Sequence, residues 1–300
     1  MIKVGIYGSA DVTDPVRKQL LRLLLRHPDV QLCAVASPAG NTVPLAELYP
    51  VYAGETELTL ERVLDLAAIE MLFVIDEENL TPEILEKYHN DPDFKLIILG
   101  RADKMRAQRP DDFVYGLPEY YRKELVRGAR AAYGPRAEAM LIELALLPLT
   151  KEGLIYGSVV GEMATNRPGT MTDACEEARV TLSNVQPGLA AGISVKAMAQ
   201  APYDRLDIVL HLSTPLAIEE IERLYNDFYS DHNFVYLLPA RTHIDEDMRG
   251  SNKCLLQLSK EGDTLTIKGT LDALTKGCTG NAVHLMDLLF GLYERTGLSI

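Results

Sequence analysis

The sequence predicts an α/β protein of two domains, in which a doubly wound parallel sheet is followed by an α+β domain with a largely antiparallel sheet. Two observations lead to this fold class. In the first half of the 300 residues, short apolar strands alternate with helical sequence, as in a parallel sheet covered by helices on both faces. In the second half, longer strand-like runs follow one another with few helices between them. We expect the first domain over 1–134, completed by a C-terminal helix within 276–300, and the second over 135–275.

The elements of the first domain are read from apolar runs and their spacing. Leucines give the stretch Asp14–His27 a broad apolar face, which predicts a helix. A second helix is expected over Tyr120–Arg130, after the apolar and aromatic turn Val114–Glu119. Buried strands, the later two with helical sequence before them, are predicted at Ile2–Tyr7, Val30–Ser37, Met71–Ile75 and Lys95–Leu99.

The second domain is expected to open with a helix at Pro135-Arg136, whose apolar run Met140–Leu149 would be buried. Helices are also predicted near Gly192–Ala199 and over Ala217–Tyr229. The last helix, Lys276–Leu292, is amphipathic and is expected to pack back on the first domain. The strands of this domain are predicted at Leu154–Glu162, Ala178–Val185, Leu206–Leu212, Phe234–Leu238, Lys253–Ser259 and Thr264–Leu271.

Composition restricts the classes of function. The formal net charge is −13 and the isoelectric point is near 5.0, which disfavours nucleic acid and anionic membranes as partners. No apolar run reaches the ~20 residues that span a bilayer, and the N-terminus begins directly with a strand, so we expect a cytoplasmic protein without a signal peptide. The 6 histidines and 4 cysteines show no metal-ligand spacing, and the cysteines are expected to be buried, reduced thiols.

The loop between the first strand and the first helix is the candidate nucleotide site, with Ser37 at the end of the second strand. Asp11 and Asp14 stand where further glycines would be needed; a carboxylate there caps the helix and repels a phosphate. A capped helix that binds no nucleotide is therefore favoured, with an altered but serviceable loop as the alternative. The candidate cofactor-binding residues are Gly8, Ser9, Ala10, Val12, Thr13 and Ser37.

The segment Ser37–Asn41 follows the second strand, where a dinucleotide's ribose meets the protein in this type of sheet. It contains no acidic residue to select an unphosphorylated ribose. Any dinucleotide bound there is therefore expected to be NADP rather than NAD. The alternative interpretation is a simple Pro-Gly loop.

Two cations form a candidate anion site. Arg136 lies at the start of a predicted helix, where free N–H groups and the helix dipole attract anions. Lys276 lies near a Gly-rich helix start and could contact a phosphate. The alternatives are a surface Arg136 that fills a vacated pocket and a solvated charge at Lys276.

The chain as a whole resembles the N-acetyl-gamma-glutamyl-phosphate reductase family of arginine biosynthesis, a relative of the aspartate-semialdehyde dehydrogenases. The resemblance implies a Rossmann-type NADP-binding domain, and a second domain that supplies substrate contacts and the oligomer interface. It covers both ends of the chain and the domain junction. The segments that carry it are Met1–Ile6, Leu20–Pro28, Val114–Glu119, Arg249–Asn252 with Cys254, Asp272–Gly280 and Met286–Gly291.

The departures from the family pattern fall on the groups that carry its chemistry. The family's Asn-Pro-Gly-Cys-Tyr-Pro-Thr segment falls on Tyr133–Ala139, so that Arg136 stands at the nucleophile. The acid/base histidine should fall near Ala191–Val195, where none is present. The strand with the substrate motif Pro-x-x-Arg-Gly is expected to be deleted between Gln200 and Leu206. The Gly-x-x-Gly-x-x-Gly loop becomes Gly8–Asp14.

Smaller changes point the same way. Ala273 and Asn281 replace an Asn and a Gln of the family's C-terminal motif. Cys175 is a poor substitute nucleophile, because its acidic neighbours raise the pKa of a thiol. The sequence thus predicts a catalytically inactive family member with a structural or regulatory role, forming a homo-oligomer or a hetero-oligomer with an active reductase. The alternatives are an NADP-dependent acyl-phosphate reductase with a rearranged site and a sensor of a small ligand.

Overall fold

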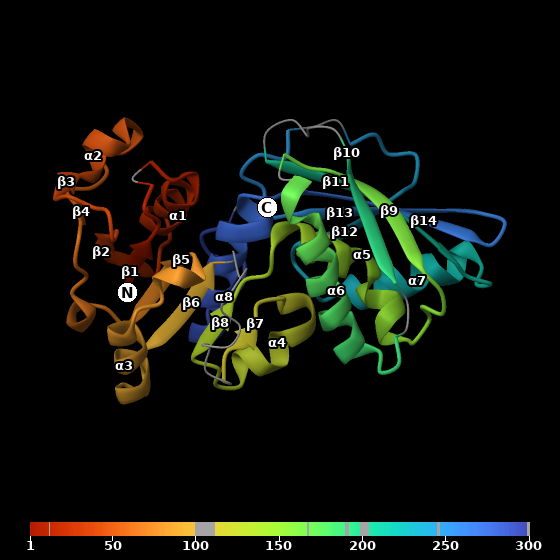
Figure 1. Cartoon of the computed structure of the whole chain (residues 1–300), viewed down its shortest axis with the longest axis horizontal. Helices are drawn as coiled ribbons and strands as arrows, with labels where there is room; N and C mark the ends of the chain where they lie inside the picture. The colour runs from red at the N-terminus through yellow and green to blue at the C-terminus, as the bar shows by residue number, and fades with distance from the viewer. Residues whose placement is uncertain are drawn as a thin grey trace. The chain divides into compact units, whose positions relative to one another are not determined.

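The computed structural model describes residues 1–11, 13–99, 112–166, 168–189, 192–198, 204–244 and 247–298. Contacts between Cα atoms divide the chain into two compact units. Unit 1 comprises Met1–Pro135 together with the C-terminal segment from Cys278, and unit 2 comprises Arg136–Gly277. Each unit is built on its own β-sheet, and Figure 1 labels the elements of both.

Unit 1 contains an eight-stranded sheet with the order β3-β4-β2-β1-β5-β6-β8-β7. All its neighbouring strands are parallel except β3 and β4. The chain passes from β1 to β2 on one side and later to β5 on the other, so the order reverses between β1 and β5. The strands are β1 (Ile2–Gly8), β2 (Val30–Ala36), β3 (Val43–Pro44), β4 (Thr59–Glu61), β5 (Met71–Ile75), β6 (Lys95–Leu99), β7 (Val114–Tyr115) and β8 (Ala131–Tyr133).

Helices cover this sheet, as the predicted doubly wound fold requires, and that fold class is confirmed. The core includes side chains of β5, β6 and α3 (Pro82–Asn90), among them Leu72, Ile98 and Tyr88, all at most 2% exposed. The other helices of unit 1 are α1 (Pro15–Leu25), α2 (Leu45–Leu48), α4 (Pro118–Val126) and α8 (Gly280–Phe290).

The prediction of a helix before Met71 is wrong. Residues 43–68 instead form β3, the single turn α2, β4 and short 3-10 turns. Pro44 and Pro50 interrupt any helix there, because a proline removes a backbone donor and clashes with the preceding turn. The C-terminal helix is also shorter than predicted, since residues Thr275–Thr279 form a π-helical turn before α8 begins.

Unit 2 contains a six-stranded sheet with the order β10-β9-β11-β14-β13-β12. Its central pairs are antiparallel, and the two outermost pairs are parallel. The helices α5 (Ala137–Lys151) and α7 (Ile218–Tyr229) pack on it, and α5 is buried from Ala137 to Thr150. The strands are β9 (Val159–Ala164), β10 (Ile193–Met198), β11 (Arg205–Ser213), β12 (Val235–Leu238), β13 (Cys254–Glu261) and β14 (Thr264–Asp272).

In unit 2, one predicted strand is a helix and one predicted helix is a strand. Residues Ala178–Val185, expected as a strand, are the end of helix α6 (Met171–Val185), where Ala174, Ala178 and Leu182 are buried at helical spacing. Residues Gly192–Ala199, expected as a helix, contain β10, whose side chains alternate between buried and exposed positions. Short apolar runs do not distinguish the two periods, which explains both errors.

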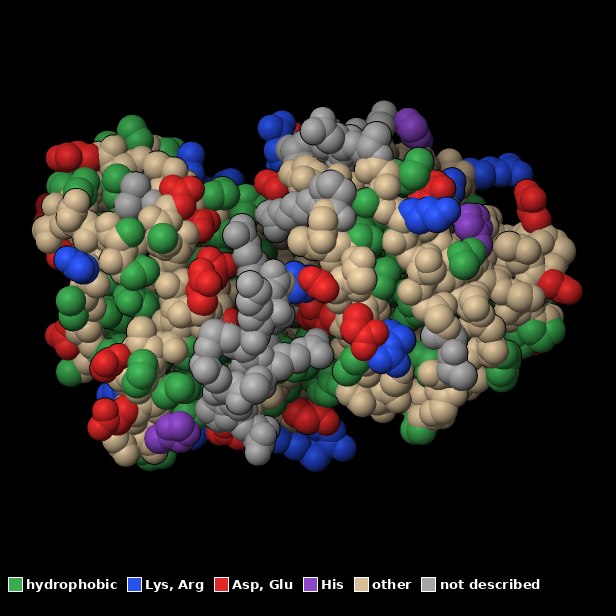
Figure 2. All heavy atoms as spheres, in the orientation of Figure 1, with side chains coloured by type: hydrophobic (Ala, Val, Ile, Leu, Met, Phe, Trp, Pro, Cys, Tyr) green, Lys and Arg blue, Asp and Glu red, His purple; other side chains and the backbone are tan. Residues whose placement is uncertain are grey.

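The described part of the chain contains no helix long and apolar enough to cross a membrane. On the face drawn in Figure 2, lysines and arginines are scattered among acidic side chains rather than gathered in one patch. This scatter agrees with the formal net charge of −13.

Candidate functional site

The loop after β1 lies at the edge of the sheet where the strand order reverses, which is where doubly wound sheets bind ligands. Gly8 has a positive φ of 117°, and a Cβ atom there would lie 2.2 Å from the carbonyl oxygen of Ile75 on β5. The close approach of the two strand ends therefore requires glycine at this position. Ser9 follows with a φ of 59°, a conformation that non-glycine residues rarely adopt.

Arg17 of α1 binds backbone carbonyl groups of this loop. Its guanidinium is fully buried and donates to the carbonyl oxygens of Gly8, Ser9 (2.8 Å) and Asp11 (2.9 Å). The hydroxyl of Ser37, also buried, donates to the Ser9 carbonyl at 2.7 Å. The loop is thus fixed from within by a residue of α1 and a residue that follows β2. The sequence analysis missed Arg17, because nothing in its spacing indicates three backbone carbonyls as partners.

Three N–H groups at and just before the start of α1, those of Thr13, Asp14 and Val16, are bonded within the loop. The Asp11 carboxylate accepts from the backbone and side chain of Thr13, both at 2.8 Å, and Asp14 caps the helix by accepting from Val16 at 2.7 Å. The Asp14 N–H donates to the Asp11 carbonyl at 3.2 Å. The Thr13 hydrogen bonds lower the pKa of Asp11, so this carboxylate is charged at neutral pH.

These contacts do not fit a dinucleotide pyrophosphate, which needs free N–H groups and no carboxylate in this position. Among the predicted cofactor residues, the structure brings Gly8, Ser9 and Ser37 together in one hydrogen-bonded loop. Ala10 and Thr13 are exposed, and Val12 lies outside the described residues. The Ser37 side chain is directed into the loop, since its hydroxyl bonds Ser9.

Arg136 is the N-cap residue of α5 and is only 8% exposed, so the alternative of a surface arginine is wrong. Its Nε lies 3.3 Å from Oε2 of Glu177, and its Nη2 lies 3.7 Å from Oδ2 of Asp173, both on α6. The Arg136 backbone N–H also donates to Glu177 Oε1 at 3.3 Å. An added anion would have to compete with two carboxylates of the protein itself, which counts against the predicted anion site.

The start of α5 carries a further buried carboxylate. Glu138 is 3% exposed, and its Oε1 accepts from the Thr165 hydroxyl at 3.3 Å. A carboxylate in the first helical turn complements the partial positive charge of the helix dipole. The start of α5, where an acyl-transfer site would stabilise a developing oxyanion, therefore has the buried carboxylates Glu138 and Glu177 beside it.

Lys276 is fully buried in the π-helical turn, so the alternative of a solvated charge is wrong. Its Nζ lies 5.6 Å from the centre of the Phe234 ring, within the range of a cation–π interaction. The next residue, Gly277, packs on Ala137, since a Cβ at Gly277 would lie 2.4 Å from that of Ala137. The structure thus places the turn of Lys276 against the helix start of Arg136, and their predicted role in anion binding stays a prediction.

The four cysteines are free thiols, of which Cys254 is buried and Cys33, Cys175 and Cys278 are partly buried. Cys175 lies between Asp173 and Glu177 on α6, whose side chains share a helical face one turn apart, so its own side chain points elsewhere. Burial raises the pKa of the Cys175 thiol, while a hydrogen bond from the Val195 backbone lowers it by less. The direction agrees with the sequence analysis, but the cause is burial rather than the neighbouring carboxylates.

The predicted deletion of the substrate motif lies between Gln200 and Leu206, where residues 199–203 are outside the described part of the chain, and it stays a prediction. The described chain resumes at Asp204, and β11 begins at Arg205. The guanidinium of Arg205 is engaged by its own unit, since Nη2 lies 2.8 Å from Asp207 Oδ1 and donates to the Ile244 carbonyl at 2.9 Å. The segment around Val195, where the family histidine was expected, carries no histidine in the sequence and forms β10.

Histidine–carboxylate pairs do occur in unit 1, but they are buried inside it. His27 Nε2 lies 3.0 Å from Asp287 Oδ1, and neither side chain is exposed. The Asp29 N–H donates to His27 Nδ1 at 3.2 Å, which places the proton of the neutral ring on Nε2, facing Asp287. Burial raises the pKa of Asp287 to about 6, and the hydrogen bond and charge of His27 lower it by less.

This pair predicts an unusual pH dependence of stability. Between the ordinary pKa of 3.8 and the folded value of about 6, the folded state binds more protons at Asp287 than the unfolded chain does, so its contribution to stability falls as pH rises. At about 1.4 kcal/mol per pKa unit, the loss is about 2 to 3 kcal/mol. Asp287→Asn keeps an acceptor for His27 and is expected to abolish this loss in urea unfolding curves measured across the window. An unchanged pH slope in Asp287→Asn, or an equal change in the exposed neighbour variant Asp29→Asn, would refute the assignment.

In the part of the chain that the structure describes, no group of three or more His, Cys, Asp or Glu side chains is arranged to hold a metal ion. No protein-family model matches the sequence. The chain is 30% identical over 325 residues to N-acetyl-gamma-glutamyl-phosphate reductase of Bacteroides thetaiotaomicron, covering 100% of this chain and 98% of the relative. It is also 30% identical to the protein of that name from Parabacteroides distasonis, over 100% and 98% of the two chains.

Solved structures of similar fold are aspartate-semialdehyde dehydrogenases. The enzyme of Candida albicans, solved with NADP, matches with a TM-score of 0.73 over 97% of this chain and 98% of that one, at 10% identity. Enzyme II of Vibrio cholerae, complexed with ASA, matches with a TM-score of 0.67 over 98% and 99%, at 11% identity. At such low identity the likeness concerns the fold alone.

Proposed function

Since the chain belongs to the N-acetyl-gamma-glutamyl-phosphate reductase family, we propose that it keeps the fold of that family but has lost the reaction, and that it serves as a structural or regulatory partner linked to arginine biosynthesis. Reduction of an acyl phosphate through a thioacyl intermediate needs a thiolate to attack, a base to generate it, and a hydride from NADPH. At the position of the thiolate, this chain has Arg136, a permanent cation that cannot attack carbon.

The observation that carries the proposal is the pairing of Arg136 with Glu177 and Asp173. The substituted residue does not lie in an empty site; it forms part of a buried ion pair that closes the start of α5. The loss of a single member of a cooperating catalytic set costs about 10⁴- to 10⁶-fold in rate. Here the nucleophile and the histidine are absent from their expected positions in the sequence, and the substrate motif is expected to be deleted.

The decisive assay is oxidation of N-acetylglutamate semialdehyde with NADP and phosphate, followed by NADPH absorbance. We expect no turnover above the uncatalysed rate, with the Bacteroides thetaiotaomicron reductase as a positive control. Turnover that disappears when one of Cys33, Cys175, Cys254 or Cys278 is changed to Ser would overturn the proposal in favour of an active reductase with a rearranged site.

The first βα loop gives a separate prediction for the coenzyme. Because the Asp11 and Asp14 carboxylates accept from the N–H groups of Thr13 and Val16 and would repel a phosphate, NADPH is expected to produce no saturable fluorescence change with this chain. The Candida albicans dehydrogenase, solved with NADP, is the control for the titration. Saturable binding that is lost in Ser37→Ala but kept in Cys33→Ala would show that the loop binds the coenzyme and contradict this prediction.

The role as a partner rests on retained structure. The chain keeps segments that carry the family resemblance, among them the turn Val114–Glu119 and the residues of the C-terminal helix α8. The proposed assembly is a homo-oligomer or a hetero-oligomer with an active family reductase. Light scattering of the chain alone, and of a mixture with the reductase encoded by the same genome, tests both. A monomer in both samples, together with an unchanged rate of the reductase, would exclude the role.

A further inference from the structure

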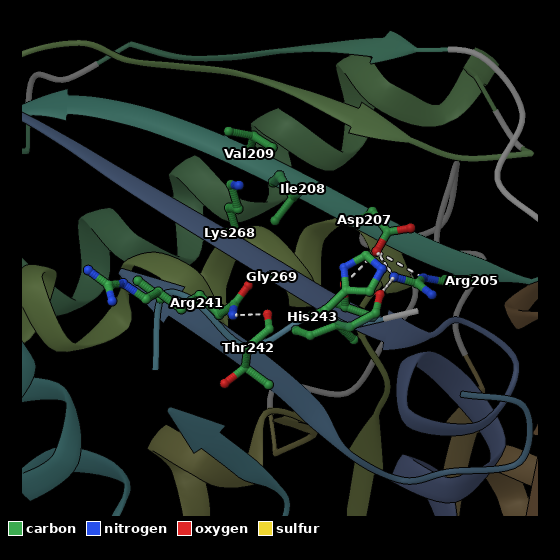
Figure 3. Close-up of a pocket in the computed structure, with 13 residues that line it drawn as sticks. Arg205, Asp207, Ile208, Val209, Arg241, Thr242, His243, Lys268 and Gly269 are labelled. Atoms are coloured by element: carbon green, nitrogen blue, oxygen red, sulfur yellow. Dashed lines mark hydrogen bonds and ion pairs between the residues drawn. The ribbon is translucent and has the colours of Figure 1, made fainter. Parts of the chain in front are cut away.

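A cavity of about 370 Å³ opens on unit 2, away from the start of α5. Its walls come from β11, β14, one residue of β13 and the loop 239–244 that follows β12 (Figure 3). Small-molecule pockets have volumes of about 300–1,000 Å³, so the cavity can enclose a compact metabolite. Among the described residues of its wall, none belongs to the segments Gly8–Asp14 or Tyr133–Ala139.

The loop that forms one wall is held in place by side chains from the sheet. Gln257 of β13 is 8% exposed, and its amide donates to the carbonyl oxygens of Pro239 at 2.9 Å and Thr242 at 2.7 Å. Arg205 donates to the carbonyl oxygen of Ile244 at 2.9 Å. Three carbonyl groups of the loop are therefore fixed by hydrogen bonds. These bonds hold the backbone that carries the side chains of Arg241 and His243.

The described lining of the cavity carries more cations than carboxylates. Among the described residues, Arg205, Arg241 and Lys268 line it together with one carboxylate, Asp207, in a chain of net charge −13. Asp207 is itself bonded to Arg205 at 2.8 Å and to the Thr270 hydroxyl at 2.5 Å. Within the described ranges, no carboxylate forms an ion pair with Lys268 or Arg241.

The lining residues stand in a regular arrangement. On β14, Lys268 lies directly opposite Val209 of β11 and Gln257 of β13, so the three side chains share one face of the sheet. In Figure 3 the His243 ring points toward the Arg205–Asp207 pair, and Lys268 and Arg241 stand at the other end of the group. Cationic groups therefore line the cavity at both ends.

We propose that this cavity binds a small organic dianion, a dicarboxylate or a phosphate monoester. Lys268 and Arg241 supply the charge that attracts it, and His243 supplies a third donor. Arg205 is a positioning residue, because its guanidinium holds the loop and Asp207. The site does not depend on the loss of catalysis proposed above, since it shares no residue with the start of α5 or with the loop after β1.

Isothermal titration calorimetry of the full chain tests the site with glutarate, glycerol 3-phosphate and the neutral glutaramide. At least one dianion is expected to bind with 1:1 stoichiometry, and glutaramide is not. Binding by glutarate alone assigns the dicarboxylate class, and binding by glycerol 3-phosphate alone assigns the phosphate class. Absence of heat from both dianions, or equal heat from glutaramide, would overturn the proposal.

Two substitutions locate the ligand. Lys268→Gln and Arg241→Gln each remove a charge-assisted hydrogen bond and are expected to weaken binding by about tenfold or more. Lys196→Gln is the matched control: Lys196 is an exposed lysine in the same sheet row, reached through Glu162 and Val209, but it does not line the cavity. A loss of affinity in Lys196→Gln equal to that in Lys268→Gln would mean non-specific attraction and reject the site.

Discussion

Arg136→Met is expected to lower the free energy of unfolding of unit 2 by about 3 kcal/mol, because removing one partner of a buried pair leaves the other charge uncompensated. The charge left behind is that of Glu177, whose side chain is 6% exposed and which accepts from both the guanidinium and the backbone N–H of Arg136. Asp173 is 62% exposed, so its part in the pair is small. Urea unfolding monitored by circular dichroism measures the loss.

The double variant Arg136→Met/Glu177→Leu distinguishes the contribution of the ion pair to stability from that of side-chain packing. Apolar groups of similar volume often replace a buried ion pair without a net cost, so the double variant is expected to recover most of the stability. Asp173→Asn serves as the exposed control, with a change within about 1 kcal/mol. If Arg136→Met were as stable as the parent, or if the double variant were less stable than Arg136→Met, the ion pair would not be what stabilises the start of α5.

Under the proposed loss of the reaction, this pair would prevent one substitution at Arg136 from restoring it. A cysteine introduced as Arg136→Cys would stand beside Glu177, and a neighbouring carboxylate raises the pKa of a thiol. It would also leave Glu177 buried without its cation. Arg136 and the acidic residues Glu177 and Asp173 of α6 therefore form one structural unit.

Arg17→Met is expected to lower stability by about 3 kcal/mol or more, because each buried acceptor left without a donor costs about 1–3 kcal/mol. The guanidinium of Arg17 is fully buried and holds the carbonyl oxygens of Gly8, Ser9 and Asp11. Hydrogen exchange of the loop is expected to accelerate with the loss. The effect is local to the edge of the sheet where β1 and β5 end.

Arg22→Met on the same helix is the control for Arg17, because Arg22 is exposed and its removal should change stability by about 0.5 kcal/mol or less. Arg17→Lys keeps the charge but presents no planar fork, so it should recover only part of the loss. A result in which Arg17→Met and Arg22→Met behave alike would show that the three carbonyls find other donors.

The sequence determined the fold class and most strands of this protein. Met71–Ile75 and Lys95–Leu99 are predicted to the residue, because strands of a parallel sheet are buried on both faces and read as continuous apolar runs. It also placed Arg136 at the start of a helix and Asp14 at the cap of α1, since both are local signals. The exchange of helix and strand at α6 and β10 marks the limit of such signals.

The tertiary structure alone determined which groups the buried charged residues contact. Arg136 and Glu177 are 41 residues apart in the sequence, and no local sequence pattern predicts that their side chains form a contact. Arg17, Gln257 and Arg205 act on backbone carbonyls brought near them only by folding. Apolar periodicity indicates which face of an element is buried, whereas the partner of a buried charge is set by packing between distant segments. For this reason the sequence placed Arg136 at a helix start but did not predict its ion pair with Glu177.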